Sequence, residues 1–132
     1  MRDFYFYTSR PLTAKDCYDS LKSEIKNLRG SNTPEEIQIS VSGKWRSYLW
    51  FYNDRLEDHM DFYETKEEFE EERKRIPIQD PYINFFETHR SVDAKRFIAV
   101  LMKIYPELYI DVDESDFWSG TAQEYLDTEF DY

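Results

Sequence analysis

Two consecutive strand-like segments constrain the fold of this chain most strongly. Residues 37–41 alternate apolar and polar side chains, the two-residue period of a strand with one buried face. The turn signal Ser42-Gly43 follows, and the aromatic segment 44–52 (KWRSYLWFY) predicts the second arm of a β-hairpin. A hairpin pairs its strands antiparallel, which excludes the strict strand–helix alternation of a parallel sheet.

The rest of the chain intersperses helices and strands. Apolar residues at helical spacing predict a helix over about 14–28, and a capping pair, Thr65 and Glu68, predicts a helix to about Arg75. Ser91 as a cap and the segment 97–102, apolar nearly all round, predict a helix over about 92–105. Strands are expected at 3–8, 58–64, 82–87 and 108–112, with one or two helical turns near 121–128. We therefore predict a single α+β domain over residues 1–132, with a mixed or mainly antiparallel sheet, a central hairpin and three main helices packed on it.

Acidic charge is concentrated at the C-terminal end. The chain has 28 acidic and 17 basic residues, a formal net charge of −11, and nine of the acids lie in residues 104–132, which hold no Lys or Arg. Residues 1–103 contribute only −2, so the acidic segment 107–132 predicts a directional negative field. Such a field favours a basic protein partner and disfavours nucleic acid and anionic membranes as direct ligands.

The segment 111–118 (DVDESDFW) is the predicted contact region, because carboxylates there flank two aromatic residues. Aromatic anchors ringed by charged groups are typical of the centre and rim of a protein interface. The alternative is that Trp118 packs on the core and the acids form a solvated loop. The predicted partner-binding residues are Asp111, Asp113, Glu114, Asp116 and Trp118, supported by Glu124 and Asp127.

No catalytic motif is apparent. A calcium loop beginning at Asp111 would need Gly at its sixth and Glu at its twelfth position, where the chain has Asp116 and Ala122. Cys17, the only cysteine, lies on the apolar stripe of the first helix, which predicts a buried and unreactive thiol. We expect a protein that is not an enzyme and that needs neither a metal ion nor another cofactor.

Two features predict a cytoplasmic location. A single cysteine allows no intrachain disulfide, which fits a reducing compartment. The N-terminal residues MRDFYFYTSRP show no basic region followed by an apolar run, so no signal peptide is predicted.

The chain resembles bacterial immunity proteins of polymorphic and contact-dependent toxin systems in three features. These are the N-terminal strand and capped helix (DFYFYTSRPLTAKDCYDSLKSEI), the late segment AKRFIAVLMKIYPELYIDVDESDFW, and the small size and acidic charge of the whole chain. The resemblance covers most of the chain as architecture and residues 94–118 as sequence. It implies a cytoplasmic antitoxin that binds a cognate basic toxin domain, such as a nuclease, and blocks its active site or substrate surface.

Two other functions stay open at this point. One is a DNA-mimic inhibitor, which needs carboxylates spaced like phosphates along an extended face. The other is a small metal-dependent hydrolase that uses the pair Asp111 and Asp113.

Overall fold

The computed structural model describes residues 2–41, 45–113 and 117–131. Its elements are, in order, β1 (Arg2–Thr8), α1 (Ala14–Glu24), β2 (Leu28–Asn32), β3 (Glu36–Val41), β4 (Trp45–Arg55), the 3₁₀ helix η1 (Leu56–Phe62), α2 (Lys66–Arg75), β5 (Tyr82–Thr88), α3 (Ser91–Ile104), β6 (Tyr109–Val112), β7 (Trp118–Thr121) and α4 (Ala122–Leu126).

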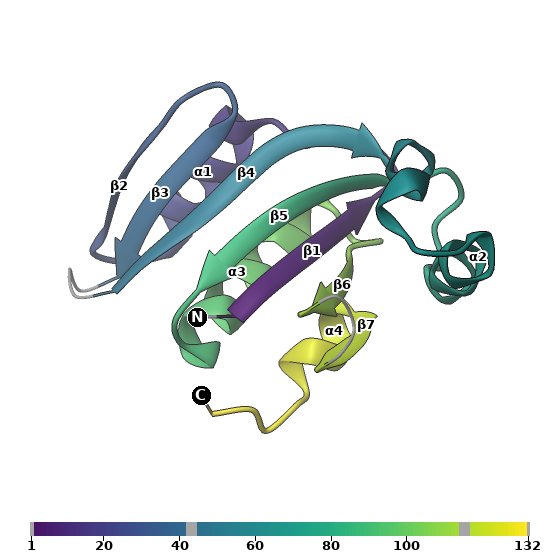
Figure 1. The fold of residues 1–132 in the computed structure, drawn as a ribbon. Coiled ribbons are helices and arrows are strands. Elements are labelled where there is room, and N and C mark those ends of the chain that lie inside the picture. The colour runs from purple at the N-terminus through teal and green to yellow at the C-terminus, as the bar shows by residue number, and fades with distance from the viewer. Residues whose placement is uncertain (1, 42–44, 114–116, 132) are drawn as a thin grey trace.

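The described strands form one antiparallel sheet of seven strands in the order β2-β3-β4-β5-β1-β6-β7 (Figure 1). The predicted α+β class is therefore confirmed. The antiparallel pairing of β3 with β4 is the expected hairpin, and its turn at residues 42–44 lies outside the described residues. The aromatic strand β4 lies inside the sheet, between β3 and β5, as its aggregation-prone composition requires.

One face of the sheet carries the main core. Phe4, Phe6 and Phe86 point to this face and pack against apolar residues of α1 and α3, which lie behind the sheet in Figure 1. Burial of this apolar area is the main favourable contribution to folding. Cys17 belongs to this core, so its predicted burial is confirmed, and burial raises the pKa of its thiol to about 12.

The opposite face is covered at one end only. There η1 and α2 lie beyond the ends of β4, β5 and β1 (Figure 1), and Phe69 of α2 packs in a second, smaller core with Tyr7, Ile83 and Tyr109. Helix α2 begins as predicted, because the Thr65 side chain accepts a hydrogen bond from the Glu68 N–H at 3.1 Å.

Three expectations about elements were wrong. Residues 58–64 are mostly the 3₁₀ helix η1 instead of a strand, and they close the turn with local bonds such as Tyr63 N–H to the Met60 carbonyl at 3.2 Å. The first helix ends at Glu24, and residues 28–32 form the edge strand β2. The tail, expected to be mostly irregular, adds β7 before the anticipated short helix α4.

None of the described helices is long and apolar enough to cross a membrane.

Candidate functional site

The two central residues of the predicted contact region are engaged within the protein. Asp111 lies on β6 with 1% of its surface exposed, and its Oδ2 accepts a hydrogen bond from the Tyr7 hydroxyl at 2.8 Å. Asp113 follows β6 and forms an ion pair with Arg2, 2.6 Å from Nη1 to Oδ2, while its Oδ1 accepts the Asp3 N–H at 3.1 Å. Asp111 is buried, whereas Asp113 is partly exposed and paired with Arg2; the part of both residues in partner binding stays a prediction.

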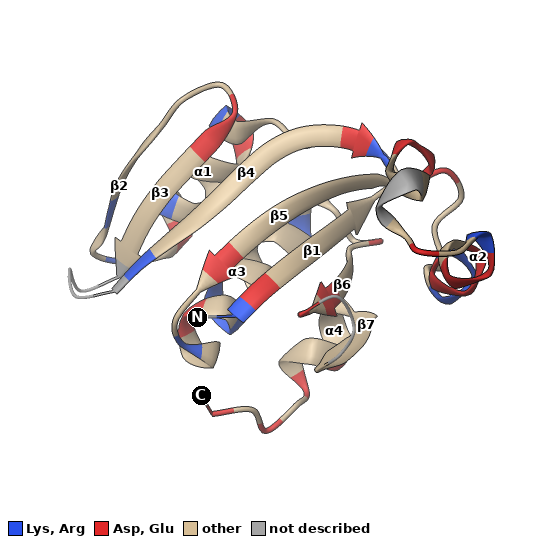
Figure 2. Cartoon of the chain, viewed as in Figure 1, with Lys and Arg blue, Asp and Glu red and all other residues tan. Residues whose placement is uncertain are grey.

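The other predicted tail carboxylates are dispersed. Glu124 forms a reciprocal capping box with Thr121 at the start of α4, and the hydrogen bond from the Thr121 backbone N–H lowers the pKa of this carboxyl. Asp127 accepts a hydrogen bond from Gln123 at 3.1 Å. Glu114 and Asp116 lie outside the described residues. Figure 2 shows acidic positions on α4 and along the segment after it. Glu107 lies apart from them, before β6, and its Oε2 accepts hydrogen bonds from the Ser9 N–H at 3.0 Å and the Ser9 hydroxyl at 2.8 Å.

Trp118 packs on the core, the alternative that the sequence left open. Its ring lies 5.4 Å from that of Tyr125, which is fully buried, and 6.2 Å from that of Phe130. Its neighbour Phe117 is 36% exposed, with the Arg2 guanidinium 4.0 Å from the ring centroid. The tail therefore closes one edge of the fold, and its part in partner binding stays a prediction.

A different surface combines aromatic and acidic groups. We call it the open face: the sheet face that carries Asp3, Tyr5, Tyr48, Trp50, Phe85 and Glu87, all partly exposed. Strand register aligns side chains on this face in rows, because cross-strand neighbours in an antiparallel sheet point the same way.

The first row of the open face is aromatic in the middle and acidic at both ends. Direct pairing places Trp50 opposite Phe85 and Phe85 opposite Tyr5. The ring centroids are 5.1 Å apart for the first pair and 5.4 Å for the second, both contact distances. Glu36 of β3 pairs with Trp50 at one end, and Asp111 of β6 pairs with Tyr5 at the other.

The second row lies two residues along the same strands. Tyr48 pairs with Glu87, and Glu87 pairs with Asp3. Tyr48 also stacks on Trp50, with 5.7 Å between centroids and 16° between planes, so the two rows are joined. The open face thus presents four contiguous rings, with the partly exposed acids Glu36, Glu87 and Asp3 beside them.

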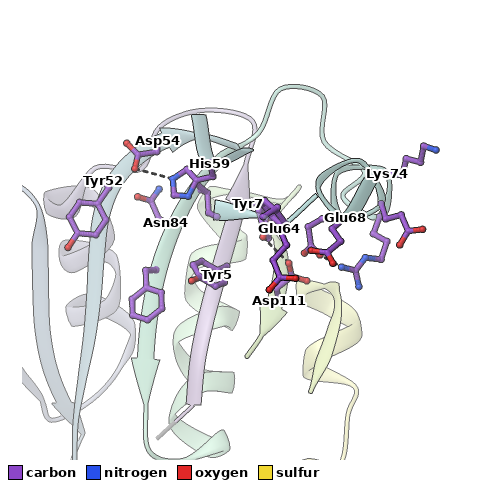
Figure 3. Close-up of a pocket in the computed structure, with 16 residues that line it drawn as sticks. Tyr5, Tyr7, Tyr52, Asp54, His59, Glu64, Glu68, Lys74, Asn84 and Asp111 are labelled. Atoms are coloured by element: carbon purple, nitrogen blue, oxygen red, sulfur yellow. Dashed lines mark hydrogen bonds and ion pairs between the residues drawn. The ribbon is translucent and has the colours of Figure 1, made fainter. Parts of the chain in front are cut away.

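A groove of about 1440 Å³ continues the open face toward η1 and α2 (Figure 3). Tyr5, Tyr7 and Phe85 line it from the sheet, and Tyr63 and His59 line it from the other side. Among its described lining residues six are acidic and two are basic; the acids are Asp54, Glu64, Glu68, Glu71, Glu72 and Asp111, and the bases are Lys74 and Arg75. A concave surface with this excess of carboxylates concentrates negative potential.

A polar network at a β-bulge shapes the rim of this groove. The register of β4 and β5 shifts between Trp50 and Asp54, and Asn53 within the shift has a left-handed backbone, φ 53°. The Asn53 side chain accepts hydrogen bonds from Leu12 N–H at 2.8 Å and Asn84 Nδ2 at 2.9 Å, and it donates to the Leu12 carbonyl at 2.8 Å. Tyr52 is thereby directed outward, with 58% of its surface exposed.

The buried end of the groove joins Tyr7 and Asp111 with Glu72 of α2. Burial raises the pKa of Tyr7 well above its ordinary value, and the neighbouring charge of Asp111 acts in the same direction. The phenol therefore stays protonated and donates to the carboxylate. Glu72, 9% exposed, forms an ion pair with Arg75.

Potential metal-ligating side chains are dispersed among the described residues. Among them, no group of three or more His, Cys, Asp or Glu side chains is arranged to hold a metal ion. His59 is 3.2 Å from Asp54 at the groove rim, and both side chains are partly exposed. The groove thus offers charge, aromatic surface and hydrogen-bonding groups, which are the components of a binding site.

The chain matches no protein-family model, no curated protein and no solved structure in comparisons with each. The fold and the site themselves define the class: an antiparallel α+β protein with one face of the sheet covered by helices and one partly exposed face that is aromatic and acidic.

Sequence reasoning missed the open face, although the signal was present. Strands β1, β4 and β5 carry aromatic residues at both parities, for example Phe4 and Phe6 on one face and Tyr5 and Tyr7 on the other. The amphipathic helices, α1 and α3, cover one face only. A sheet with two apolar faces and helices for one face predicts a second surface available to a partner.

Proposed function

We propose that this protein is a non-enzymatic binding protein of the immunity type, which neutralises a basic bacterial toxin domain by docking it on the open face. The observation that carries the proposal is the partly exposed aromatic row Trp50, Phe85 and Tyr5, with the partly exposed acids Glu36, Glu87 and Asp3 beside it.

Rings and carboxylates contribute to binding in different ways. Trp and Tyr anchors near the centre of an interface contribute most of the binding free energy and slow dissociation. Acidic groups at the rim accelerate encounter with a cationic partner and add little to affinity. The groove, with six acidic and two basic described lining residues, supplies such a rim beside the aromatic row.

The alternatives receive less support. A DNA mimic needs a continuous line of carboxylates, whereas the centre of the open face is apolar. For a hydrolase using Asp111 and Asp113, one carboxylate is buried against Tyr7 and the other is paired with Arg2. A small-molecule site is usually about 300–1000 Å³ and enclosed, and the groove is larger.

The test uses the C-terminal domain of the protein encoded by the neighbouring gene as the candidate toxin. We expect tight binding by the wild-type protein and loss of toxin activity in the complex. Trp50→Ala is expected to raise the dissociation constant about 30-fold or more, the effect of a central aromatic anchor. Tyr18→Ala removes a partly buried ring from α1, on the other side of the sheet, and should change affinity less than about threefold.

Circular dichroism would first establish that both variants are folded. Equal losses in the two variants, or full inhibition by Trp50→Ala, would remove the open face from the mechanism. Failure of the folded wild-type protein to bind or inhibit the neighbouring domain would overturn the immunity assignment.

A further inference from the structure

Two carboxylates lie directly opposite each other on the open face. Asp3 of β1 and Glu87 of β5 are a register pair on neighbouring strands, and both side chains are partly exposed. Like charges in this position destabilise a sheet, so the pair has a cost for folding. Burial raises the pKa of Glu87, and the charge of Asp3 and a hydrogen bond between the two carboxyl groups act in the same direction.

Aromatic rings lie on two sides of this acid pair. Tyr48 is the register neighbour of Glu87 on β4, and its ring stacks on Trp50. Phe85 lies two residues from Glu87 on β5, and Tyr5 lies two residues from Asp3 on β1, a separation of about 7 Å along a strand. The pair therefore lies at the edge of a continuous ring surface, and a flat cation bound by both carboxylates would also contact that surface.

Arg2, the chain neighbour of Asp3 on β1, is engaged elsewhere, whereas the positive charges that lower the pKa of Glu87 are those of the N-terminus and His89. The Arg2 Nη1 is 2.6 Å from Asp113 Oδ2, and the Arg2 guanidinium lies 4.0 Å from the centre of the Phe117 ring. This internal contact combines a carboxylate with an aromatic ring around one guanidinium. The open face repeats the same combination of groups at Asp3, Glu87 and Tyr48.

We propose that Asp3 and Glu87 bind an arginine side chain of the partner, whose guanidinium bridges the two carboxylates and whose plane and stem contact the rings of Tyr48, Trp50 and Phe85. This inference rests on the proposed function, because it names the side chain that the open face recognises. A guanidinium presents planar donors that can serve two carboxylates and it stacks on aromatic faces, whereas an ammonium group is a strongly hydrated point charge. A second copy of this chain is disfavoured as the occupant, because each copy carries a formal net charge of −11.

The test measures direct binding of small probes to the ¹⁵N-labelled protein by NMR. The probes are the capped tripeptide Gly-Arg-Gly, the same peptide with Lys, and the same peptide with citrulline, which keeps the shape of arginine without its charge. We expect the arginine peptide to shift the backbone amides of Asp3 and Glu87 and the indole N–H of Trp50. The lysine peptide should bind about fivefold more weakly or worse, and the citrulline peptide should give no saturable shift.

Two double variants make the test specific. Asp3→Asn with Glu87→Gln should weaken arginine-peptide binding at least about tenfold, because both charged acceptors are lost. The matched control, Asp19→Asn with Glu129→Gln, removes the same charge from exposed positions of α1 and the C-terminal segment and should leave binding unchanged. Equal binding of the arginine and lysine peptides, persistence of binding in the first double variant, or its loss in the control would each overturn the proposal.

The same variants separate this inference from the proposed function. If the toxin domain binds the wild-type protein and the Asp3→Asn/Glu87→Gln variant equally, the arginine site is wrong and the immunity function stands. If the arginine peptide binds as expected and the toxin domain does not bind, the arginine site stands and the immunity function is wrong.

Discussion

Asp111 shows how one carboxylate can serve both the fold and a candidate site. Its position on β6 places it at the end of the aromatic row, yet it is almost fully buried and accepts the Tyr7 hydroxyl. A buried carboxylate needs such donors, because an ion that loses its hydration without compensation destabilises the fold by several kcal/mol. The spacing of acids in the sequence could not reveal this, since burial depends on pairing between β1 and β6.

Replacing Tyr7 by Phe tests this contribution. The change removes the hydroxyl and preserves the ring, so we expect the free energy of unfolding to fall by about 2 kcal/mol, the range for a hydrogen bond to a charged group. Urea denaturation at neutral pH measures the loss. In the Asp111→Asn background the same replacement should have a smaller effect, because the acceptor is then neutral; an equal loss would show that the bond to the charged carboxylate is not the cause.

Glu87 makes stability depend on pH in a defined direction. Its pKa is raised in the fold above its ordinary value of 4.5, so the folded chain holds this proton more tightly than the unfolded chain does. The resulting stabilisation is fully present below pH 4.5 and is lost as the pH rises through the raised folded value. Glu87→Gln should therefore stabilise the protein at neutral pH, by about 0.5 kcal/mol.

The measurement is the difference in unfolding free energy between wild type and Glu87→Gln from pH 4 to 8. The stabilising effect of the variant should shrink as the pH falls toward 4.5. Glu67→Gln, at an exposed position of α2, is the control. A difference that is independent of pH, or that grows on acidification, would contradict the raised pKa.

At the scale of elements, the bulge in β4 allows a long strand to leave the sheet and begin η1. Asn53 has a left-handed backbone, which Asn tolerates better than most residues. It also links β4 to the loop before α1 through Leu12 and to β5 through Asn84. The bulge thereby fixes the position of Tyr52 and Asp54 at the rim of the groove.

We expect Asn53→Ala to lower the free energy of unfolding by about 3 kcal/mol, because it strains the backbone and removes three side-chain hydrogen bonds. Asn53→Gly removes the same bonds and accommodates the positive φ, so its loss should be smaller by about 1 kcal/mol. Thermal and urea denaturation of both variants measures the two contributions. Equal losses would show that the backbone conformation at this bulge carries no strain.

The elements that could be predicted are those with a strong local period. The alternating residues of β3 and the apolar residues of α1 and α3 indicate the type of each element, because the sequence pattern shows which face is buried. The edge strands β2 (LRGSN) and β7 (WSGT) could not be predicted, since each contains Gly and polar residues and is held by pairing with its neighbour. For η1 the short alternation at Met60 and Phe62 suggested a strand, whereas the segment forms a 3₁₀ helix closed by local hydrogen bonds.

At the scale of the whole molecule, the C-terminal segment closes the fold. Phe130 packs against Phe117, Trp118 and Tyr125, and its backbone carbonyl accepts the Ser91 hydroxyl of α3 at 2.9 Å. Lys95 of α3 donates to the Thr128 carbonyl. An excess of acids in the sequence predicted a docking element here, but formal charge gives no information on which residues of the same segment anchor it to the core.

Phe130→Ala should lower the free energy of unfolding by about 2 kcal/mol, less than for a fully buried Phe because this ring is partly exposed. Asp131→Asn, at the neighbouring exposed position, should have an effect within about 0.5 kcal/mol. Chemical denaturation of the two variants provides the comparison. A Phe130→Ala variant as stable as wild type would show that Phe130 does not stabilise the fold. The C-terminal segment would then again be a candidate for partner binding.

The candidate site was only partly predictable at this scale. The composition shows an acidic chain rich in aromatic residues, and the open face contains both kinds of residue. Their location depends on the strand order β4-β5-β1, which brings Trp50, Phe85 and Tyr5 together from distant parts of the chain. Such long-range pairing is set by the global packing of the sheet, which local patterns do not encode.

The aromatic row lies on β4, β5 and β1, each hydrogen-bonded to a strand on both sides, so it is built on the interior of the sheet. Amide hydrogens under the row should exchange with solvent only through global unfolding. The rings would then already hold their bound positions in the free protein, and binding would cost little conformational entropy on this side of the interface. We therefore expect the backbone of the open face to change little when a partner binds.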